Sequence, residues 1–342
     1  MCRFCDQTSF GQDDAYDPQL GRSGFVPGAN MAPDLILTGG TILTMDEARP
    51  EAEAIAVRQG VIQAVGRSAE ILARRGRASR VMALEGRALV PGFIGTGLRL
   101  PVEGDRASLD RWIEGRARAG FTTVDVTDLG QGWGAFDRLS RLIDRRHRLR
   151  LRGAVDEGLR RDWRNGRLEP GHGNDLVRIE AVRLDAKDGP ETLAKALRLR
   201  AEGWGVVIDC ADGDDLAALL PLAALVDGRA LKGLRIVTPG AGPAAQALRE
   251  AGLTVVERAA ENPAVLLTGP RDVVLARLAT LTRDAARLAG LANIAGQLRA
   301  GAYADFTVLD RSPLCPAGTA PEVVGTWIEG VPVRPEADHV TA

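Results

Sequence analysis

The sequence predicts an α/β fold in which a (β/α)8 TIM-like barrel is joined to a small composite β-sandwich. In the middle of the chain, eight strand-like segments alternate with amphipathic helical segments, which favours a closed barrel over an open sheet. Short β-rich runs separated by glycine turns lie on both sides of this middle part. Both ends of the chain are therefore expected to contribute to one sandwich.

Three regions follow from this interpretation. Residues 1–32 are rich in Gly, Asp, Gln and Ser without sustained periodicity, and predict a polar N-terminal arm. Residues 33–90 and 296–335 carry the β-rich runs of the composite domain, in which Gln59-Gly60 is typical of a hairpin turn. Residues 91–295 are expected to form the barrel.

The barrel elements can be named in order. Apolar residues at helical spacing predict helices around residues 109–113, 136–143 and 193–197. The link from Val256 to Val265 is too short for a full helix, so one helix is expected to be missing there. The eight expected strands are "ALVPGFI", "FTTVDVTD", "LRLRGAVDE", "VRIEAVRLD", "GVVIDCAD", "LRIVTPG", "LTVVERA" and "AVLLTG".

Composition excludes several classes of function. A hydrophobic content of 45% with a net charge of −1 is that of an ordinary globular protein and argues against a nucleic-acid partner. The longest apolar stretches are too short and too interrupted to cross a bilayer, so no membrane partner is expected. Acidic residues stand near the N-terminus where a signal peptide needs an apolar core, and four cysteines do not make a disulfide framework. We therefore expect a cytoplasmic protein.

Five segments of the two β blocks and the barrel have a distinctive sequence: "PDLILTGGTILTMDEARPEAEAIAVRQGVIQAVG", "VMALEGRALVPGFI", "ARAGFTTV", "TLTRDAARLAGL" and "GQLRAGAYADFTVLDRSPL". They resemble the amidohydrolase superfamily, most closely its branch of metal-dependent amide and N-acyl hydrolases. The resemblance covers roughly residues 33–334, and the β blocks are its most specific part. It implies a metal-dependent (β/α)8 hydrolase barrel with a composite β-sandwich.

The resemblance fails at the residues that bind the metal. In the family, "PGFID" leads into His-x-His, whose two imidazoles bind a divalent cation at the barrel mouth. Here Gly95 replaces the aspartate, and Gly97 and Arg99 replace the two histidines. Glycine offers no ligand, and an arginine brings a permanent positive charge to a cation site.

The remaining ligand positions of the family are also replaced. The bridging lysine or glutamate of the fourth strand aligns with Arg183, and the histidines of strands five and six align with Asp209 and Thr238. The eighth-strand aspartate falls on Thr268 or Gly269. None of the three histidines of the chain (His147, His172 and His339) is placed to replace a barrel ligand. We therefore expect no metal or other cofactor in the barrel.

Carboxylates end several of the expected strands, where barrels of this type build their active sites. One interpretation is an acidic pocket for a cationic ligand or a hard cation. The favoured alternative is that these carboxylates cap helices and pair with the many arginines. The mouth residues are Asp125, Asp128, Asp156, Glu157, Asp185, Asp209, Thr238 and Glu257. The candidate catalytic residues among them are Asp209, Asp185 and Asp125.

A second candidate site lies in "MCRFC". Cys2 and Cys5 have the C-x-x-C spacing of half a zinc site, an iron–sulfur ligand pair or a redox dithiol. The alternative, two free thiols in the arm, is favoured. If the pair does bind zinc or iron, the ion is expected to be shared with a partner chain, because two thiolates do not complete a tetrahedral site.

Two hypotheses about function remain. In the favoured one, the chain is a catalytically inactive amidohydrolase-like protein that serves as a structural or regulatory subunit, together with a protein partner or other copies of itself. In the alternative, it hydrolyses non-peptide C–N bonds without the usual metal, using mouth carboxylates as general acid and base. Asp209 is the first residue to test in that case, since it occupies a former ligand position on a barrel strand.

Overall fold

The computed structural model describes most of the chain outside the N-terminal arm. Within residues 1–32, the described elements are the short strands β1 (Ala15–Tyr16) and β2 (Phe25–Val26), which pair antiparallel. The predicted arm therefore lies largely outside the described residues. The described residues are 15–16, 25–26, 31–101, 105–130, 133–145, 149–158, 168–186, 190–223, 233–315 and 319–334.

A parallel sheet in the middle of the chain forms the predicted barrel. It runs in chain order from β8 to β15, and an antiparallel two-residue strand, β11 (His172–Gly173), is added to β12. The N–H of Ala259 donates to the carbonyl of Thr96 at 3.0 Å, which connects the two ends of the sheet. The strands are β8 (Phe93–Leu98), β9 (Phe121–Val126), β10 (Arg150–Asp156), β12 (Val177–Leu184), β13 (Gly205–Asp209), β14 (Leu234–Thr238) and β15 (Thr254–Glu257).

The eighth expected strand is wrong. Its segment "AVLLTG" begins as a 3₁₀ helix, η3 (Pro263–Leu266). Proline at the first helical position pre-sets a helical turn, and Pro270 lies at the N-cap of the next helix. No helix lies between β15 and η3, as the short link predicted.

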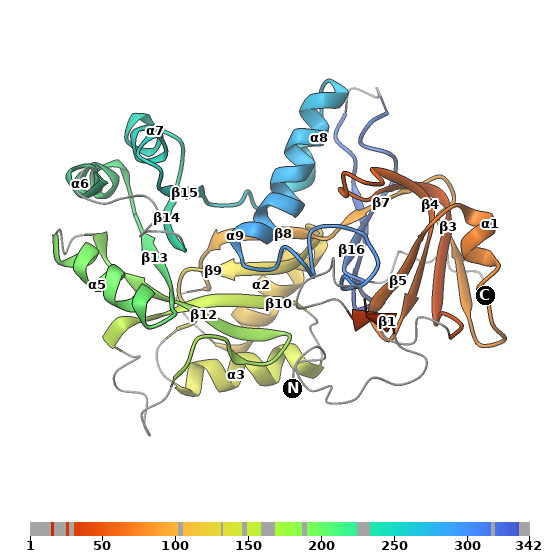
Figure 1. Cartoon of the computed structure of the whole chain (residues 1–342), viewed down its shortest axis with the longest axis horizontal. Coiled ribbons are helices and arrows are strands. Elements are labelled where there is room, and N and C mark those ends of the chain that lie inside the picture. Colours follow the sequence, from red (N-terminus) through yellow and green to blue (C-terminus); the bar gives the residue numbers. More distant parts are fainter. Residues whose placement is uncertain are drawn as a thin grey trace.

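Helices cover the outside of the barrel, and the three predicted from apolar spacing are confirmed as α2, α3 and α5. Figure 1 shows α2 and α3 on one side of the strands and α5, α6 and α7 grouped at the end far from the second sheet. The helices are α1 (Ser68–Leu72), α2 (Arg106–Arg118), α3 (Trp133–Arg145), α5 (Pro190–Ala201), α6 (Gly213–Ala223), α7 (Pro243–Glu250), α8 (Arg271–Ala279) and α9 (Ala285–Leu288), with a π-helical segment, η4 (Thr280–Asp284), between the last two.

A layer of small and β-branched side chains fills the barrel interior. Five consecutive strands, β10 to β15, each contribute one buried residue to it: Ala154, Ala181, Val207, Val237 and Val256. Because alternate residues of a strand face the same side, this layer shows which other residues of each strand face the barrel interior. Residues two positions later face the mouth, and residues two positions earlier lie deeper in the barrel.

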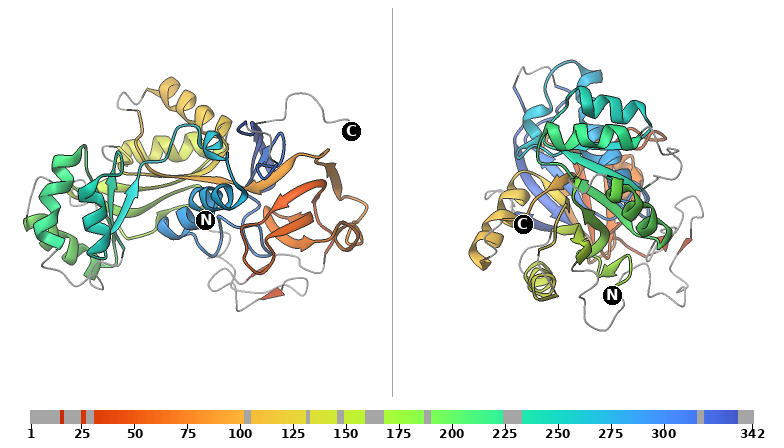
Figure 2. Two further views of the ribbon diagram at one scale, coloured as in Figure 1. Left: turned by 90° about the horizontal axis from the view of Figure 1, so that it is seen from above. Right: turned by 90° about the vertical axis from the view of Figure 1, so that its left-hand side faces the viewer.

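The second sheet takes strands from both sides of the barrel sequence, and Figure 2 shows it beside the barrel. Its order is β18-β17-β16-β7-β3-β4-β5, with β6 added to β3. The predicted hairpin is confirmed, since Gln59 and Gly60 have φ of 49° and 79° between the antiparallel β4 and β5. The strands are β3 (Leu35–Leu43), β4 (Glu51–Arg58), β5 (Val61–Gly66), β6 (Arg80–Ala83), β7 (Ala88–Pro91), β16 (Phe306–Leu309), β17 (Val323–Ile328) and β18 (Val331–Arg334).

A buried arginine joins the barrel to this sheet. Arg150, at the start of β10, is fully buried, and its Nη2 donates to Asp305 at 3.3 Å and to Glu329 at 3.3 Å. Its Nη1 donates to the carbonyl of Asp175 at 3.0 Å, and its guanidinium carbon lies 3.5 Å from the ring centroid of Tyr303. The barrel and the sheet therefore share a buried, charged contact with several hydrogen bonds.

Candidate functional site

The carboxyl ends of the barrel strands bring an aspartate and two arginines together. The Asp209 side chain is 3% exposed at the end of β13. Arg99, which follows β8, donates from Nε to Oδ2 of Asp209 at 3.0 Å, and its Nη2 lies 2.8 Å from the same oxygen. Thr127, after β9, donates its hydroxyl to that oxygen at 3.0 Å, while Arg258, after β15, donates to Oδ1. Both carboxylate oxygens are thus bound by arginine.

The sequence did not identify Arg258 and Thr127 as mouth residues. It pointed to Glu257 instead. Glu257 instead lies on the outer side, 2.9 Å from Arg249 of α7. The signal was present in the strand alternation, because Arg258 follows the interior residue Val256 by two positions. Arg258 also donates to the carbonyl of Cys210 at 3.1 Å, which fixes its guanidinium over the end of β13.

A second, looser group of charges surrounds Arg183 at the mouth. Its Nη2 lies 3.7 Å from Asp128 and 3.6 Å from Asp156, and all three side chains are between 32% and 46% exposed. Each aspartate also accepts a backbone N–H two residues ahead, Gly130 for Asp128 and Gly158 for Asp156, both at 2.8 Å. These carboxylates pair with arginine and stabilise local turns, as the favoured alternative predicted.

Asp125 and Asp185, the other candidate catalytic residues, do not join this cluster. Asp125 lies deeper in the barrel, where Arg235 of β14 binds it at 2.7 and 3.1 Å through two parallel hydrogen bonds. The mouth position on that strand belongs to Thr127, two residues later, so the expected place of Asp125 is wrong. Asp185 is exposed after β12, and its carbonyl accepts a hydrogen bond from Thr192 at 2.9 Å.

The five positions that the resemblance predicts to replace the metal ligands of the family do not fit a metal ion. Gly97 has φ of 68°, and a Cβ added there would lie 2.6 Å from Val237, so an imidazole has no room. Thr238 follows the interior residue Val237, faces the other side of β14 and donates its hydroxyl to the carbonyl of Gly240 at 3.0 Å. Arg99 and Arg183 are cationic, and Asp209 is bound by arginine. These five positions therefore provide no set of side-chain atoms that could ligate a metal ion.

Elsewhere in the described part of the chain, no group of three or more His, Cys, Asp or Glu side chains is arranged to hold a metal ion. His172 lies on β11 and its ring centroid is 5.6 Å from that of Phe136. Burial, with the charges of Asp215 and Asp209, raises the pKa of the Cys210 thiol to about 12, which disfavours the thiolate that metals require. His147, His339, Cys2 and Cys5 lie outside the described residues.

Comparison with known proteins places the fold. No family model matches the chain. A segment of 74 residues, 22% of this chain, is 38% identical to Protein LONG AFTER FAR-RED 3 of Arabidopsis thaliana and spans 13% of that protein.

Solved structures give matches over most of the chain. An adenosine deaminase from Xanthomonas campestris with bound zinc matches with a TM-score of 0.62 at 17% identity, over 90% of this chain and 95% of that one. The guanine deaminase of E. coli has a TM-score of 0.59 at 14% identity, over 87% and 98%. A solved amidohydrolase has a TM-score of 0.55 at 14% identity, over the same shares. The chain has the fold of the amidohydrolase superfamily, as the resemblance implied.

Proposed function

We propose that this chain is a catalytically inactive amidohydrolase-fold protein that acts as a structural or regulatory subunit of a larger complex. The observation that carries the proposal is the binding of Asp209 by Arg99 and Arg258. A metal ion at Asp209 would have to displace at least one guanidinium from a nearly buried carboxylate. It would then lie beside two fixed positive charges, which repel a divalent cation.

The subunit role is supported by what the fold retains and by what it leaves exposed. The barrel and the second sheet are both present although the ligand positions are replaced. Val265 and Leu266 of η3 are 54% and 39% exposed, next to the link that lacks a helix. Exposed apolar side chains favour a contact with a protein partner or a second copy.

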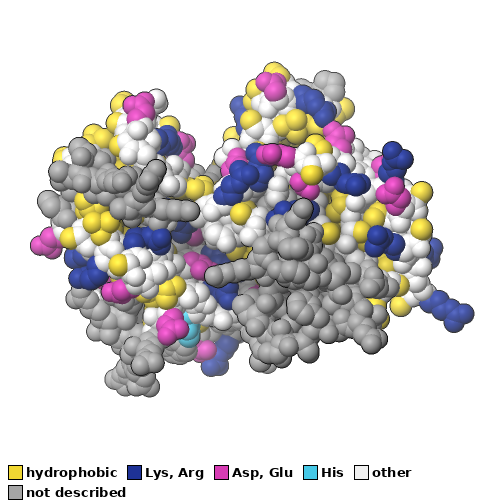
Figure 3. Space-filling view, viewed as in Figure 1, with side chains coloured by type: hydrophobic (Ala, Val, Ile, Leu, Met, Phe, Trp, Pro, Cys, Tyr) yellow, Lys and Arg dark blue, Asp and Glu magenta, His cyan; other side chains and the backbone are white. Residues whose placement is uncertain are grey.

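We propose that the chain binds neither nucleic acid nor a membrane. In the described part of the face in Figure 3, basic and acidic side chains are interspersed rather than gathered in one basic patch. No helix in the described residues has the length and apolar composition needed to span a membrane. The free thiols Cys210 and Cys315 support a reducing, cytoplasmic location.

The alternative, a C–N bond hydrolase without the usual metal, is favoured by one observation. Asp128 and Asp156 share Arg183 at 3.7 and 3.6 Å, yet both remain partly exposed, so a substrate can reach them. Two carboxylates in one site can act as general acid and base. Asp209 fits this role less well, because both of its oxygens are occupied.

Metal content and hydrolysis test the first half of the proposal. Untagged native protein, a Cys2→Ser/Cys5→Ser variant and an Asp209→Asn variant are analysed for zinc and iron, then assayed with N-acyl amino acids, cyclic amides and aminopurines, with and without added zinc. We expect no turnover and no metal in the barrel. Metal lost only from the double-serine variant assigns it to the arm. Metal that is retained by the double-serine variant but lost from Asp209→Asn contradicts the proposal that the barrel binds no metal. Turnover that Asp156→Asn abolishes contradicts the proposal that the chain is catalytically inactive.

The subunit role has a separate test. The native chain is isolated at its natural level of expression and its mass is measured by size-exclusion chromatography with light scattering. We expect a stoichiometric assembly with a partner or with other copies, which Val265→Asp and Leu266→Asp weaken. A monomer that never forms such an assembly contradicts this half of the proposal.

A further inference from the structure

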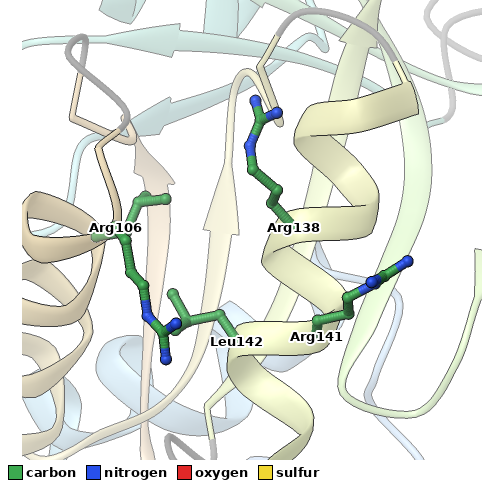
Figure 4. A pocket seen from close by; sticks show the side chains of 5 residues that line it. Arg106, Arg138, Arg141 and Leu142 are labelled. Atoms are coloured by element: carbon green, nitrogen blue, oxygen red, sulfur yellow. The ribbon is translucent and has the colours of Figure 1, made fainter.

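A cavity of about 290 Å³ lies between α2 and α3, on the outside of the barrel strands (Figure 4). No residue of the mouth cluster lines it, so it is a place separate from the former metal positions. Its size is near the lower end of the range for small-molecule pockets, about 300–1,000 Å³. Its lining residues are Arg106, Leu109, Arg138, Arg141 and Leu142.

The floor of this cavity is apolar. Leu109 of α2 and Leu142 of α3 are buried and belong to the main hydrophobic core. Both side chains are therefore held in place by packing from below, while the cavity exposes one side of them to a ligand. An apolar group that covers this floor is removed from water at a favourable free energy.

Two arginines at the rim remain available to a ligand. Arg106 is 72% exposed, and its Nε lies 3.9 Å from Asp110, beyond hydrogen-bonding distance. Arg138 is exposed and forms no ion pair with another described residue. Figure 4 shows Arg106 reaching from α2 toward Leu142, and Arg138 extending along the side of α3 that faces α2.

The third arginine of the lining is already engaged. Arg141 lies 2.9 Å from Asp137, one turn earlier on α3. In Figure 4 its guanidinium is directed away from α2. It has the same charge as Arg138 and lies on the same helix, but its guanidinium is already paired with Asp137.

We propose that this cavity binds a small amphipathic anion, with an apolar chain on Leu109 and Leu142 and a terminal carboxylate or phosphate bound by Arg106 or by Arg138, whose guanidinium groups lie toward opposite ends of the cavity in Figure 4. Arginine is suited to both headgroups because its planar guanidinium donates two parallel hydrogen bonds to them. The cavity volume limits the ligand to roughly ten to fifteen heavy atoms. The binding requires neither a metal nor turnover, and so goes beyond the proposed function.

The experiment titrates the full chain with octanoate and with octyl phosphate by isothermal calorimetry. We expect saturable binding at one site for at least one of the two, and the stronger ligand identifies the headgroup. Removing one charged hydrogen-bonding partner in Arg106→Ala or Arg138→Ala weakens binding about tenfold or more. Arg118→Ala, a matched control on the exposed face of α2, changes it less than about twofold.

Three further measurements decide the proposal. Neutral octanol binds at least about tenfold more weakly if the arginines recognise the charge. Leu142→Trp fills the cavity and abolishes binding, with the melting temperature recorded to confirm folding. The proposal is overturned if neither anion binds, if Arg106→Ala/Arg138→Ala binds like the native chain, or if inorganic phosphate binds as tightly as octyl phosphate. Asp209→Asn is expected to bind normally, which separates this site from the mouth.

Discussion

The Asp209 carboxylate and the Arg99 guanidinium lie 2.8 Å apart although 110 residues separate them in the chain. From the resemblance, both residues are expected at metal-ligand positions of the amidohydrolase superfamily. At the barrel mouth they bind each other, and Arg258 completes the group from β15. The Xanthomonas adenosine deaminase, which has a similar fold, is solved with bound zinc. In this chain Asp209, Arg99 and Arg258 form an ion cluster.

We expect Asp209→Asn to destabilise the protein by about 2 kcal/mol, because a neutral amide leaves the charges of Arg99 and Arg258 close together without their shared anion. Arg99 is half exposed, so water offsets part of the loss. Urea unfolding followed by circular dichroism measures the change.

Asp156→Asn is the matched control, since that carboxylate is partly exposed and lies 3.6 Å from its arginine. Its expected effect is below about 1 kcal/mol. Equal stability of the two variants, or a gain of zinc by Asp209→Asn, would be inconsistent with a cluster that stabilises the mouth.

The deeper pair of Asp125 and Arg235 predicts a larger effect. Asp125→Ala leaves a guanidinium unpaired in the barrel interior and should cost about 3–5 kcal/mol. The double variant Asp125→Leu/Arg235→Met removes both charges and fills the space, so it should recover most of the loss. A double variant as unstable as Asp125→Ala would show that the charge pair itself is not the cause.

The alternation of strand-like and helical segments, together with the resemblance to a family, was enough to predict most of the fold. Seven of the eight expected segments contain a barrel strand, although Ala88–Pro91 of the first segment belongs to the second sheet as β7 and the barrel strand begins at Phe93. The segment at 264–269 has the same apolar character, but Pro263 at the first helical position favours a helical turn. Local propensity therefore decided between strand and helix where hydrophobicity alone could not.

The site was predictable in part. The resemblance to the family drew attention to Arg99, Asp209 and Gly97, but did not predict what binds Asp209. The alternation on β15 placed Arg258 on the interior side, a signal that was passed over in favour of Glu257. The partnership of Arg99 with Asp209 depends on how the first and fifth barrel strands approach each other, and a single sequence does not contain that distance.

Glu180 on β12 predicts a dependence of stability on pH. Burial raises the pKa of its carboxyl above the ordinary 4.5, against the opposing charges of Arg152 and Arg178. The folded protein therefore holds this proton more tightly than the unfolded chain does. Its contribution to stability is complete below about pH 4.5 and is lost as the pH rises through the folded-state pKa.

Unfolding in urea at several pH values between about 4 and 8 tests this sign. The stability of the native chain should fall relative to that of Glu180→Gln as the pH rises. Glu114→Gln, on the exposed surface of α2, serves as the control and should run parallel to the native chain. A native curve that instead rises relative to Glu180→Gln would contradict the assigned direction.

Cys210 and Cys315 should differ strongly in reactivity. Cys210 is buried after β13, and the pKa of its thiol is raised to about 12, whereas Cys315 is exposed. In a Cys2→Ser/Cys5→Ser background at about pH 8, Cys315 is expected to react with a thiol reagent at least about a thousandfold faster, since the thiolate is the nucleophile. Spectrophotometric titration should count one thiol in the folded protein and two in urea. Cys315→Ser in the same background should leave no reactive thiol in the folded state. Rapid reaction of Cys210 in this variant would mean that the end of β13 opens readily. The Asp209 cluster would then not hold the mouth closed.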